Sequence, residues 1–411
     1  MEVKPGYKLT EVGVIPEDWS FSRLIQLSDR IFDYRGRTPK KLGLEWGHGI
    51  IPALSAGNVK SGYIDFNEEC NFGSDLLYRR WMTNGDLSKN DIVFTMEAPL
   101  GNVALIPDKR KYILSQRTIC IRAEDGSTKS KFLFHYLQSE IFRRLLLDNA
   151  TGSTATGIKR KRLEQLFVVV PSLPEQTAIA TTLSDVDALI SSLDALISKK
   201  KQIKQGAMQE LLSGKRRLPA FSGEWEVKRL GDVAPLQRGF DLPTTQIKPG
   251  TYPVVYSNGV LNHHSAYQVK GPGIITGRSG TIGKVTIINE DYWPHNTSLW
   301  VTSLKGNDVL FVYYLFICIE LERFATGSGV PTLNRNDVHE YSVTLPPLPE
   351  QQAIAAILSD MDSDITALEA RRDKTKLLKQ GMMQELLTGR IRLPMEHSTV
   401  SVKTKLTVGM Q

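Results

Sequence analysis

Cysteine is scarce in this sequence, and its spacing argues against two kinds of small, cross-linked fold. The 411 residues include only Cys70, Cys120 and Cys318, which lie far apart and form no Cys-x-x-Cys pair. A disulfide framework calls for an even set of cysteines, and a structural zinc site calls for closely spaced pairs. We therefore expect neither, and a reducing cytoplasm is the natural location.

Long apolar runs are also missing. The longest, residues 309–319, is too short to cross a bilayer, and the start Met-Glu-Val-Lys-Pro-Gly-Tyr lacks the apolar core of a signal peptide. With 41% apolar and 23% charged residues, the composition is that of an ordinary globular protein, long enough for two or three domains. The net charge of +7 and pI near 9.1 favour a polyanionic partner only weakly.

Catalytic motifs are absent as well. Residues 277–285 resemble a phosphate-binding P-loop, but they depart from its spacing. Five residues instead of four separate Gly277 from the Gly283-Lys284 pair, and Val285 replaces the magnesium-binding Ser or Thr. A DNA methyltransferase would need a glycine-rich adenosylmethionine loop and an Asn/Asp-Pro-Pro-aromatic site, and the chain contains neither. Aspartates and histidines are scattered without metal-site spacing. We expect no catalytic residues, no metal site and no cofactor on this chain.

What the sequence does contain is a gapless tandem repeat. Residues 173–219 recur as residues 348–394, with roughly 28 of 47 aligned positions identical. Each copy opens with Leu-Pro-Glu-Gln, since proline and an acid suit a first helical turn, and closes on a glycine that can form a left-handed cap. We predict one long helix over residues 173–213 and another over residues 348–388.

Apolar residues in both predicted helices step by four and three, which is the seam of a coiled coil. The positions expected to pair the helices are Ile179, Leu183, Val186, Ile190, Leu193 and Ile197 in the first copy, and Ile354, Leu358, Met361, Ile365 and Leu368 in the second. Arg372 stands where Ile197 would recur, and we interpret the lysine run at 199–201 as a solvated face. A narrow seam needs one partner helix, and the other copy in the same chain can supply it.

Two segments that differ from one another precede the helices, at about residues 20–165 and 226–340. Each opens with a tryptophan and a short strand, and each continues with strand, glycine loop, strand patterns whose loops fall at about 95–101 and 277–283. Apolar helices are predicted at 131–147 and 309–324, followed by Ala-Thr-Gly-Ser at 150–153 and 325–328 and another short strand. The two segments are therefore predicted to be mixed α/β domains of one fold with divergent loops.

Basic residues fall in those divergent loops, at matched places in the two segments. Four cations stand in a row at 159–162, and a solvated face explains one such run better than four recurring ones. The residues that we predict to contact DNA are Arg35, Arg37, Lys40, Lys159, Arg160, Lys161, Arg162, Arg238, His263, His264, Arg278, Ser279, Thr281, Lys284, Asn334 and Arg335.

The order of these features resembles the specificity subunit of type I restriction-modification systems. The resemblance runs from about residue 5 to residue 394. It rests on Pro16-Glu17-Asp18-Trp19 at the start, the Gly-Ser near each domain exit, Pro-Leu-Pro-Glu-Gln-Gln-Ala-Ile-Ala opening a helix and Lys-Gln-Gly-Met-Met-Gln-Glu-Leu-Leu-Thr-Gly closing it.

The resemblance implies an α+β fold with pseudo-two-fold symmetry. Two target recognition domains, at 20–165 and 226–340, are separated by two long helices packed as an antiparallel coiled coil, with an N-terminal segment at 1–19 and a disordered tail at 395–411. Each domain would read one half of an interrupted DNA site, and the helices would set the gap. They would also dock two modification subunits, which methylate adenine at N6, and motor-nuclease restriction subunits would join for cleavage. Adenosylmethionine, ATP and magnesium would then belong to the partners, and no membrane is involved.

Two other readings stay open at this point. The chain could be a nuclease or methyltransferase in its own right, which activity of the purified chain would establish. It could also be a coiled-coil scaffold without DNA readout, which would bind every duplex equally at every salt concentration. The missing motifs disfavour the first alternative and the divergent basic loops disfavour the second.

Overall fold

The computed structural model describes residues 3–68, 70–152, 156–327 and 329–394. The predicted tail at 395–411 and the serines at 153 and 328 lie outside these ranges. The fold comprises two compact units, residues 1–191 with 373–411 (unit 1) and residues 192–372 (unit 2). Each unit contains one of the divergent segments together with parts of both long helices, α5 (Leu173–Leu212) and α9 (Leu348–Leu386).

Unit 1 is built on a four-stranded sheet in the order β4-β10-β7-β8, with a smaller sheet β6-β5-β9 and the pairs β1-β2 and β3-β11. Its strands are β1 (Tyr7–Thr10), β2 (Gly13–Pro16), β3 (Ser20–Arg23), β4 (Ser28–Asp33), β5 (Ile51–Leu54), β6 (Phe72–Gly73), β7 (Ile92–Met96), β8 (Leu100–Leu105), β9 (Ile113–Leu114), β10 (Thr118–Ala123) and β11 (Phe167–Val170). Its shorter helices are α1 (Asp75–Trp81), α2 (Ser130–Leu137), α3 (Glu140–Asp148) and α4 (Arg160–Leu163).

Unit 2 repeats the central sheet as β13-β19-β16-β17 and adds β15-β14-β18, β12-β22 and β20-β21. Its strands are β12 (Glu226–Arg229), β13 (Leu236–Arg238), β14 (Tyr252–Tyr256), β15 (Gly259–His264), β16 (Gly273–Gly277), β17 (Val285–Ile288), β18 (Trp293–Pro294), β19 (Ser298–Val301), β20 (Ala325–Thr326), β21 (Thr332–Leu333) and β22 (Ser342–Leu345). Its shorter helices are α6 (Leu230–Val233), α7 (Val309–Ile319) and α8 (Arg335–His339).

The middle of each central sheet is covered on both faces, which explains why every residue of β7 and of β16 is buried. Along β7, Phe94 packs into the core that also contains the ends of α5 and α9, whereas its neighbour Val93 packs into a second core with α1 and β5. Side chains alternate across a strand, so the two cores share one sheet. Unit 2 divides in the same way at Ile274 and Ile275.

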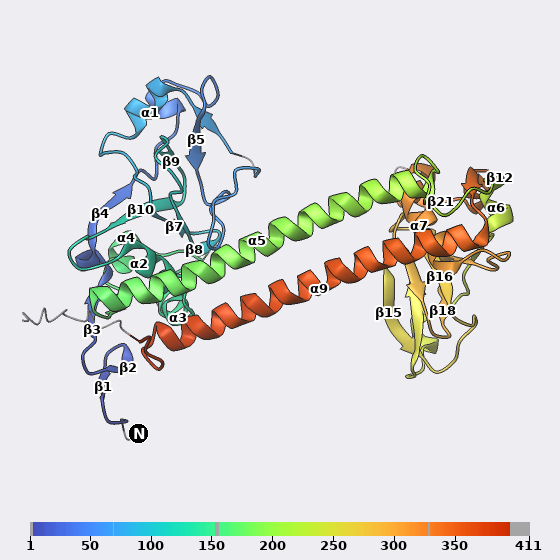
Figure 1. Ribbon diagram of the computed structural model, residues 1–411. Helices are drawn as coiled ribbons and strands as arrows, with labels where there is room; N and C mark the ends of the chain where they lie inside the picture. Colours follow the sequence, from blue (N-terminus) through green and yellow to red (C-terminus); the bar gives the residue numbers. More distant parts are fainter. Residues whose placement is uncertain (1–2, 69, 153–155, 328, 395–411) are drawn as a thin grey trace, which may run out of the picture. The chain divides into compact units, whose positions relative to one another are not determined.

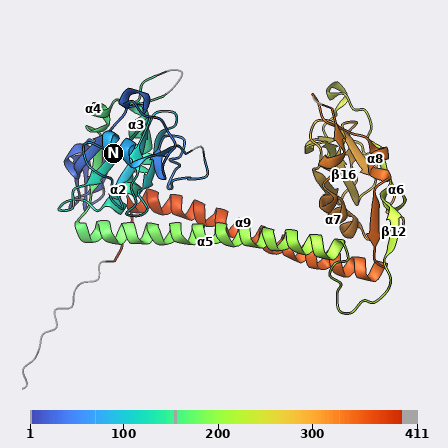
Figure 2. The ribbon, with the colours of Figure 1, turned by 90° about the horizontal axis from the view of Figure 1, so that it is seen from above.

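The long helices run antiparallel within each unit, as Figures 1 and 2 show. Along the predicted seam, Ile179 and Leu183 belong to the same core as Met383 and Leu386 in unit 1, and Ile354 and Leu358 to the same core as Met208 in unit 2. Leu193, Ile197 and Ile365 are buried as well, and Val186, Ile190, Met361 and Leu368 are half-buried.

One predicted helix was wrong, and one predicted surface carries more contacts than expected. The helix predicted over 131–147 is broken in two, because Ser139 caps the start of α3 by accepting a hydrogen bond from the Phe142 amide. The lysine run at 199–201 is largely exposed, as expected of a solvated face, and Lys200 and Lys201 also form ion pairs with Asp364 and Glu369 on the other helix at 3.0 and 2.7 Å. These ion pairs are partly exposed and each contributes at most about 1 kcal/mol.

A buried carboxylate at the start of each long helix accepts hydrogen bonds from an arginine and a tryptophan of neighbouring segments. In unit 2, Glu350 accepts hydrogen bonds from Arg217 at 2.9 and 2.7 Å and from the Trp225 indole at 3.1 Å. In unit 1, Glu175 accepts from Arg392 and from the Trp19 indole. The tryptophan that opens each divergent segment is therefore bonded to the start of one long helix, and through that glutamate to the segment that follows the other helix.

Candidate nucleic-acid interface

The basic residues that follow the strands converge at one edge of each central sheet. In unit 1, β4 and β7 are both antiparallel to β10, so both end at the same edge. Just beyond that edge lies an open hollow of about 430 Å³. It is lined by Arg35, Glu97, Thr151, Gly157, Ile158, Lys159 and Arg160. Three predicted DNA-contacting cations therefore do come together.

Carboxylates already hold the two arginines of this hollow in place. Arg35 donates two hydrogen bonds to Asp33 in a bidentate ion pair, at 2.9 and 2.7 Å, and Arg160 donates to Glu164 at 2.6 Å. Burial of Asp33 acts to raise the pKa of its carboxyl, but hydrogen bonds from Arg35 outweigh that effect and lower the pKa. The pair is therefore charged at neutral pH, and the arginine is presented in one orientation. Lys159, Lys161 and Arg162 remain exposed.

Unit 2 builds the same edge with different side chains. β13 and β16 are both antiparallel to β19, and they end at Arg238 and Gly277. Arg278 donates to the Asn296 carbonyl at 3.2 Å, and Arg238 pairs with Asp241 at 2.8 Å. Asn334 and Arg335 begin the short helix α8 beside it, in exposed positions.

The strand registers give a residue-by-residue correspondence between the two edges. The carbonyl of Met96 accepts from the Ile158 amide, as the carbonyl of Arg278 accepts from the Leu333 amide. The next residues form matching bridges, Glu97 with Gly157 and Ser279 with Thr332. Glu97 thus corresponds to Ser279, Lys159 to Asn334 and Arg160 to Arg335.

The glycine loop of unit 2 is a tight turn. A Cβ on Gly277 would lie 1.7 Å from the Thr281 carbonyl oxygen, so the loop can fold back on itself only without a side chain there. Thr281 is exposed at its tip, and Lys284 donates to the Asn258 carbonyl at 2.6 Å.

Four predicted DNA contacts lie elsewhere. His263 and His264 pair with the start of β14, at the end of the β14–β15 hairpin away from the glycine loop, and His264 is buried against Trp293. Arg37 donates to the Trp81 carbonyl and to Thr83, so it holds the end of α1 in place. Lys40 is exposed on a separate turn. Sequence spacing alone could not show that these four residues lie away from the sheet edges.

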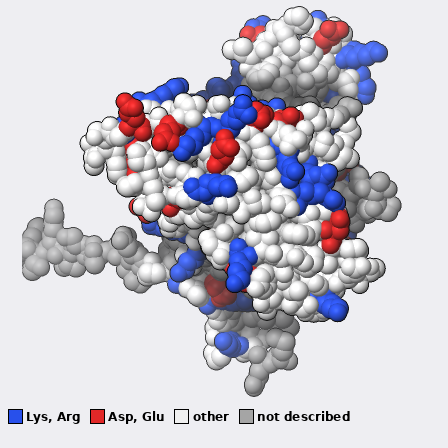
Figure 3. All heavy atoms as spheres, turned by 90° about the vertical axis from the view of Figure 1, so that its right-hand side faces the viewer, with Lys and Arg blue, Asp and Glu red and all other residues white. Residues whose placement is uncertain are grey.

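The part of the surface drawn in Figure 3 carries lysines and arginines interspersed with acidic side chains. On that face the cations do not merge into one large patch. At the two edges, too, arginines lie beside carboxylates, as Arg35 does with Asp33 and Arg238 with Asp241.

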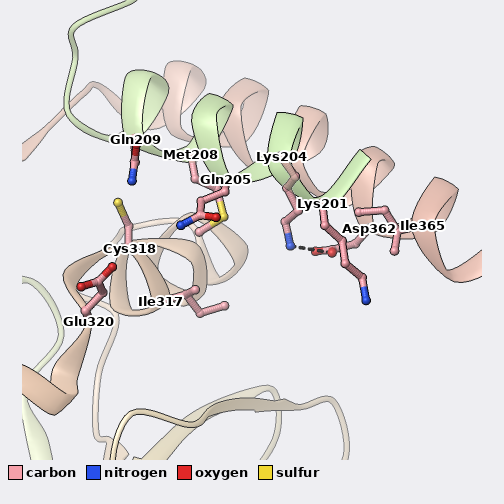
Figure 4. Close-up of a pocket in the computed structure, with 10 residues that line it drawn as sticks. All are labelled: Lys201, Lys204, Gln205, Met208, Gln209, Ile317, Cys318, Glu320, Asp362 and Ile365. Atoms are coloured by element: carbon pink, nitrogen blue, oxygen red, sulfur yellow. Dashed lines mark hydrogen bonds and ion pairs between the residues drawn. The ribbon is translucent and has the colours of Figure 1, made fainter. Parts of the chain in front are cut away.

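A second repeated feature lies where the long helices meet the shorter ones. Grooves of about 370 Å³ in unit 2 and 390 Å³ in unit 1 are lined by the same repeated triplet, Gln205, Met208 and Gln209 in one and Gln380, Met383 and Gln384 in the other. Figure 4 shows the unit 2 groove, with Gln205 and Met208 directed towards the end of α7 and Lys204 paired with Asp362.

Beside each groove the helix exposes a glycine next to a large apolar side chain. Ile203 and Leu378 are 49% and 59% exposed, and Gly206 and Gly381 follow one turn later on the same face. Neither glycine has a positive φ, and a Cβ at either would meet nothing within 4 Å. A mid-helix glycine costs about 1 kcal/mol relative to alanine. Among the described residues nothing accounts for that cost.

Other kinds of site are not evident in the described part of the chain. Within it, no three His, Cys, Asp or Glu side chains are grouped so that they could hold a metal ion. No helix in the described ranges is long and apolar enough to span a membrane.

The family profile of the type I restriction modification DNA specificity domain matches residues 16–205 and 222–379. The chain belongs to this family. The MjaIX specificity subunit of Methanocaldococcus jannaschii is 24% identical over 431 residues, covering 94% of this chain and 96% of the relative. The EcoprrI specificity subunit of Escherichia coli is 24% identical over 360 residues, covering 81% and 86%.

A solved structure shares the fold. The S subunit of the type I restriction-modification system from M. genitalium superimposes with a TM-score of 0.59 at 17% identity, covering 94% of this chain and 98% of that one. Family membership makes this chain a DNA sequence-recognition subunit of a type I restriction-modification system, and the expectation drawn from the sequence is confirmed at that level.

Proposed function

We propose that this chain is a non-catalytic subunit whose two recognition domains each read one half of an interrupted DNA site. The observation that carries the proposal is the repeated sheet edge, which keeps the same backbone and the same arginine position (Arg160 and Arg335) in both units while most other side chains differ. Cations at a shared position suit phosphates, which are the same in every sequence, and the differing side chains suit bases. A single domain contacting a few base pairs gains too little to select one genomic site, so two joined domains are needed.

The proposal assigns the long helices the role of spacer. α5 has 40 residues, or about 60 Å at 1.5 Å per residue. Two features would fix the register of α5 and α9: the apolar seam residues, and the ion pairs of Lys204 with Asp362 and of Lys379 with Asp187. A change in helix length should therefore change the gap between the two half-sites.

We further propose that two modification subunits dock at the repeated grooves and the exposed glycine faces beside them. Because the triplets and the glycines are identical in the two units, one kind of partner can occupy both places. Those partners would carry adenosylmethionine and methylate adenine at N6, and restriction subunits with ATP and magnesium would join for cleavage in the cytoplasm.

The spacer role is tested by inserting four residues after Ser198, co-expressing the chain with modification subunits and mapping N6-methyladenine across the host genome. Four residues add about 6 Å and about one turn, so the seam keeps facing its partner and the gap should lengthen by a base pair or two with both half-sites unchanged. The control is a two-residue insertion at the same place, which turns the seam by about 200° and should abolish methylation. An unchanged gap in the active four-residue variant would refute the spacer role.

A further inference from the structure

The edge of unit 1 contains one residue of the wrong charge for a phosphate-binding surface. Glu97 is exposed at the end of β7, in the hollow that it shares with Arg35, Lys159 and Arg160. A carboxylate there repels the DNA backbone and lowers affinity for every sequence alike. Its presence beside Arg35, Lys159 and Arg160 in this hollow therefore requires a separate explanation.

Balancing the charge of the neighbouring arginines is mainly the role of other carboxylates: the hydrogen bond to Asp33 raises the pKa of the Arg35 guanidinium most, and the charge of Glu97 adds a smaller effect. Arg35 already has Asp33 at 2.7 Å, and Arg160 has Glu164 at 2.6 Å. Within the described ranges, Glu97 itself forms no ion pair within 4.0 Å. Its carboxylate oxygens are left to accept hydrogen bonds from outside the chain.

The correspondence with unit 2 adds an independent observation. Ser279 occupies the position of Glu97, with the same bridge to the following segment, whereas Arg335 occupies the position of Arg160. A charged acceptor in one unit is thus replaced by a small hydroxyl in the other, while the adjacent cation is kept. That contrast is expected where one position reads bases and its neighbour contacts phosphate.

We propose that Glu97 is a specificity-determining residue that accepts a hydrogen bond from the exocyclic amino group of a base in the first half-site. Cytosine N4 is the amine that carboxylates usually recognise in the major groove, and phosphates and the oxygen edges of guanine and thymine are excluded by its charge. Ser279, which can both donate and accept, performs the corresponding contact in the second half-site with weaker selectivity. This inference rests on the proposed reading of two half-sites.

The test uses the full-length chain, purified with modification subunits, to select bound duplexes from a library in which both half-sites are randomised. Glu97→Gln keeps the size of the side chain and removes the charge. We expect one base position of one half-site to lose discrimination by about 10- to 100-fold, with the other half-site and the gap unchanged. Glu97→Ala should lose discrimination at the same position. The matched control is Glu124→Gln, an exposed acid that follows β10 at the opposite edge of the same sheet and should alter nothing.

Three results would overturn the proposal in different ways. If Glu97→Gln selects the same sites as the wild-type chain with the same affinity, Glu97 reads no base. If it binds all sequences more tightly, with a steeper salt dependence and unchanged preferences, Glu97 acts only by repelling phosphates. If the wild-type chain itself selects no interrupted site, the proposed function fails, and that outcome is distinguishable because it does not depend on the variant.

Discussion

Replacing the two exposed glycines with alanine separates the stability of this chain from its assembly. Gly206→Ala lies in unit 2 and Gly381→Ala in unit 1, and a Cβ at either position has open space around it. Alanine is favoured over glycine within a helix by about 1 kcal/mol, partly because it restricts the unfolded chain. Each variant should therefore raise the melting temperature of its unit, by roughly 2–4 °C for a unit of this size.

The same substitutions should weaken the binding of modification subunits. If a partner helix packs closely on Gly206 and Gly381, a methyl group pushes it away, and a larger residue pushes it further. Gly206→Leu should weaken binding of a modification subunit by more than Gly206→Ala, whereas Thr366→Leu, on an exposed position of α9, should not. Differential scanning calorimetry of the free chain and sedimentation with modification subunits measure the two effects.

Either of two results would refute a docking role for these glycine faces. A lower melting temperature for Gly206→Ala would mean that the glycine has a role inside the folded chain. Undiminished assembly of Gly206→Leu and Gly381→Leu would mean that no partner packs on these faces, and the docking sites would have to be sought elsewhere.

Three further predictions concern charge. Alanine at all of residues 159–162 should weaken binding to every duplex and flatten the dependence of affinity on salt, measured by titration at several salt concentrations; an unchanged slope would contradict phosphate contact. Glu350→Leu should lower the free energy of unfolding in urea titrations, because the Arg217 guanidinium and the Trp225 indole lose the buried carboxylate that accepts from both, and the exposed control Glu226→Gln should not. Burial, reinforced by the charges of Lys379 and Lys131, lowers the pKa of His135 to about 3. Since this lies below the unfolded value of about 6.5, stability should be complete above that pH and fall by about 1.4 kcal/mol per unit as the pH drops towards 3, and His135→Gln should lose that part of the slope.

Much of the architecture could be predicted from the sequence because it depends on local periodicity. The ends of α5 and α9 lie within two residues of the prediction, since proline, glutamate and glycine mark helix ends through short-range backbone effects. The seam was readable for the same reason, because a three-four spacing places apolar residues on one helix face whatever surrounds them. The strand, glycine loop, strand patterns and the correspondence of the two divergent segments also followed from pattern alone.

Residues that act together across the chain were beyond such reasoning. The sequence predicted a DNA contact for both His264 and Arg160. Strand pairing buries His264 at the far end of a hairpin, whereas it brings Arg160 beside Arg35. The position of Glu97 in the hollow and the hydrogen bonds of Glu350 to Arg217 and Trp225 were missed, because no pattern in the neighbouring sequence indicates either. Helix and strand patterns are determined by neighbours in sequence, whereas the recognition edge depends on which strand ends meet, and only the tertiary structure decides that.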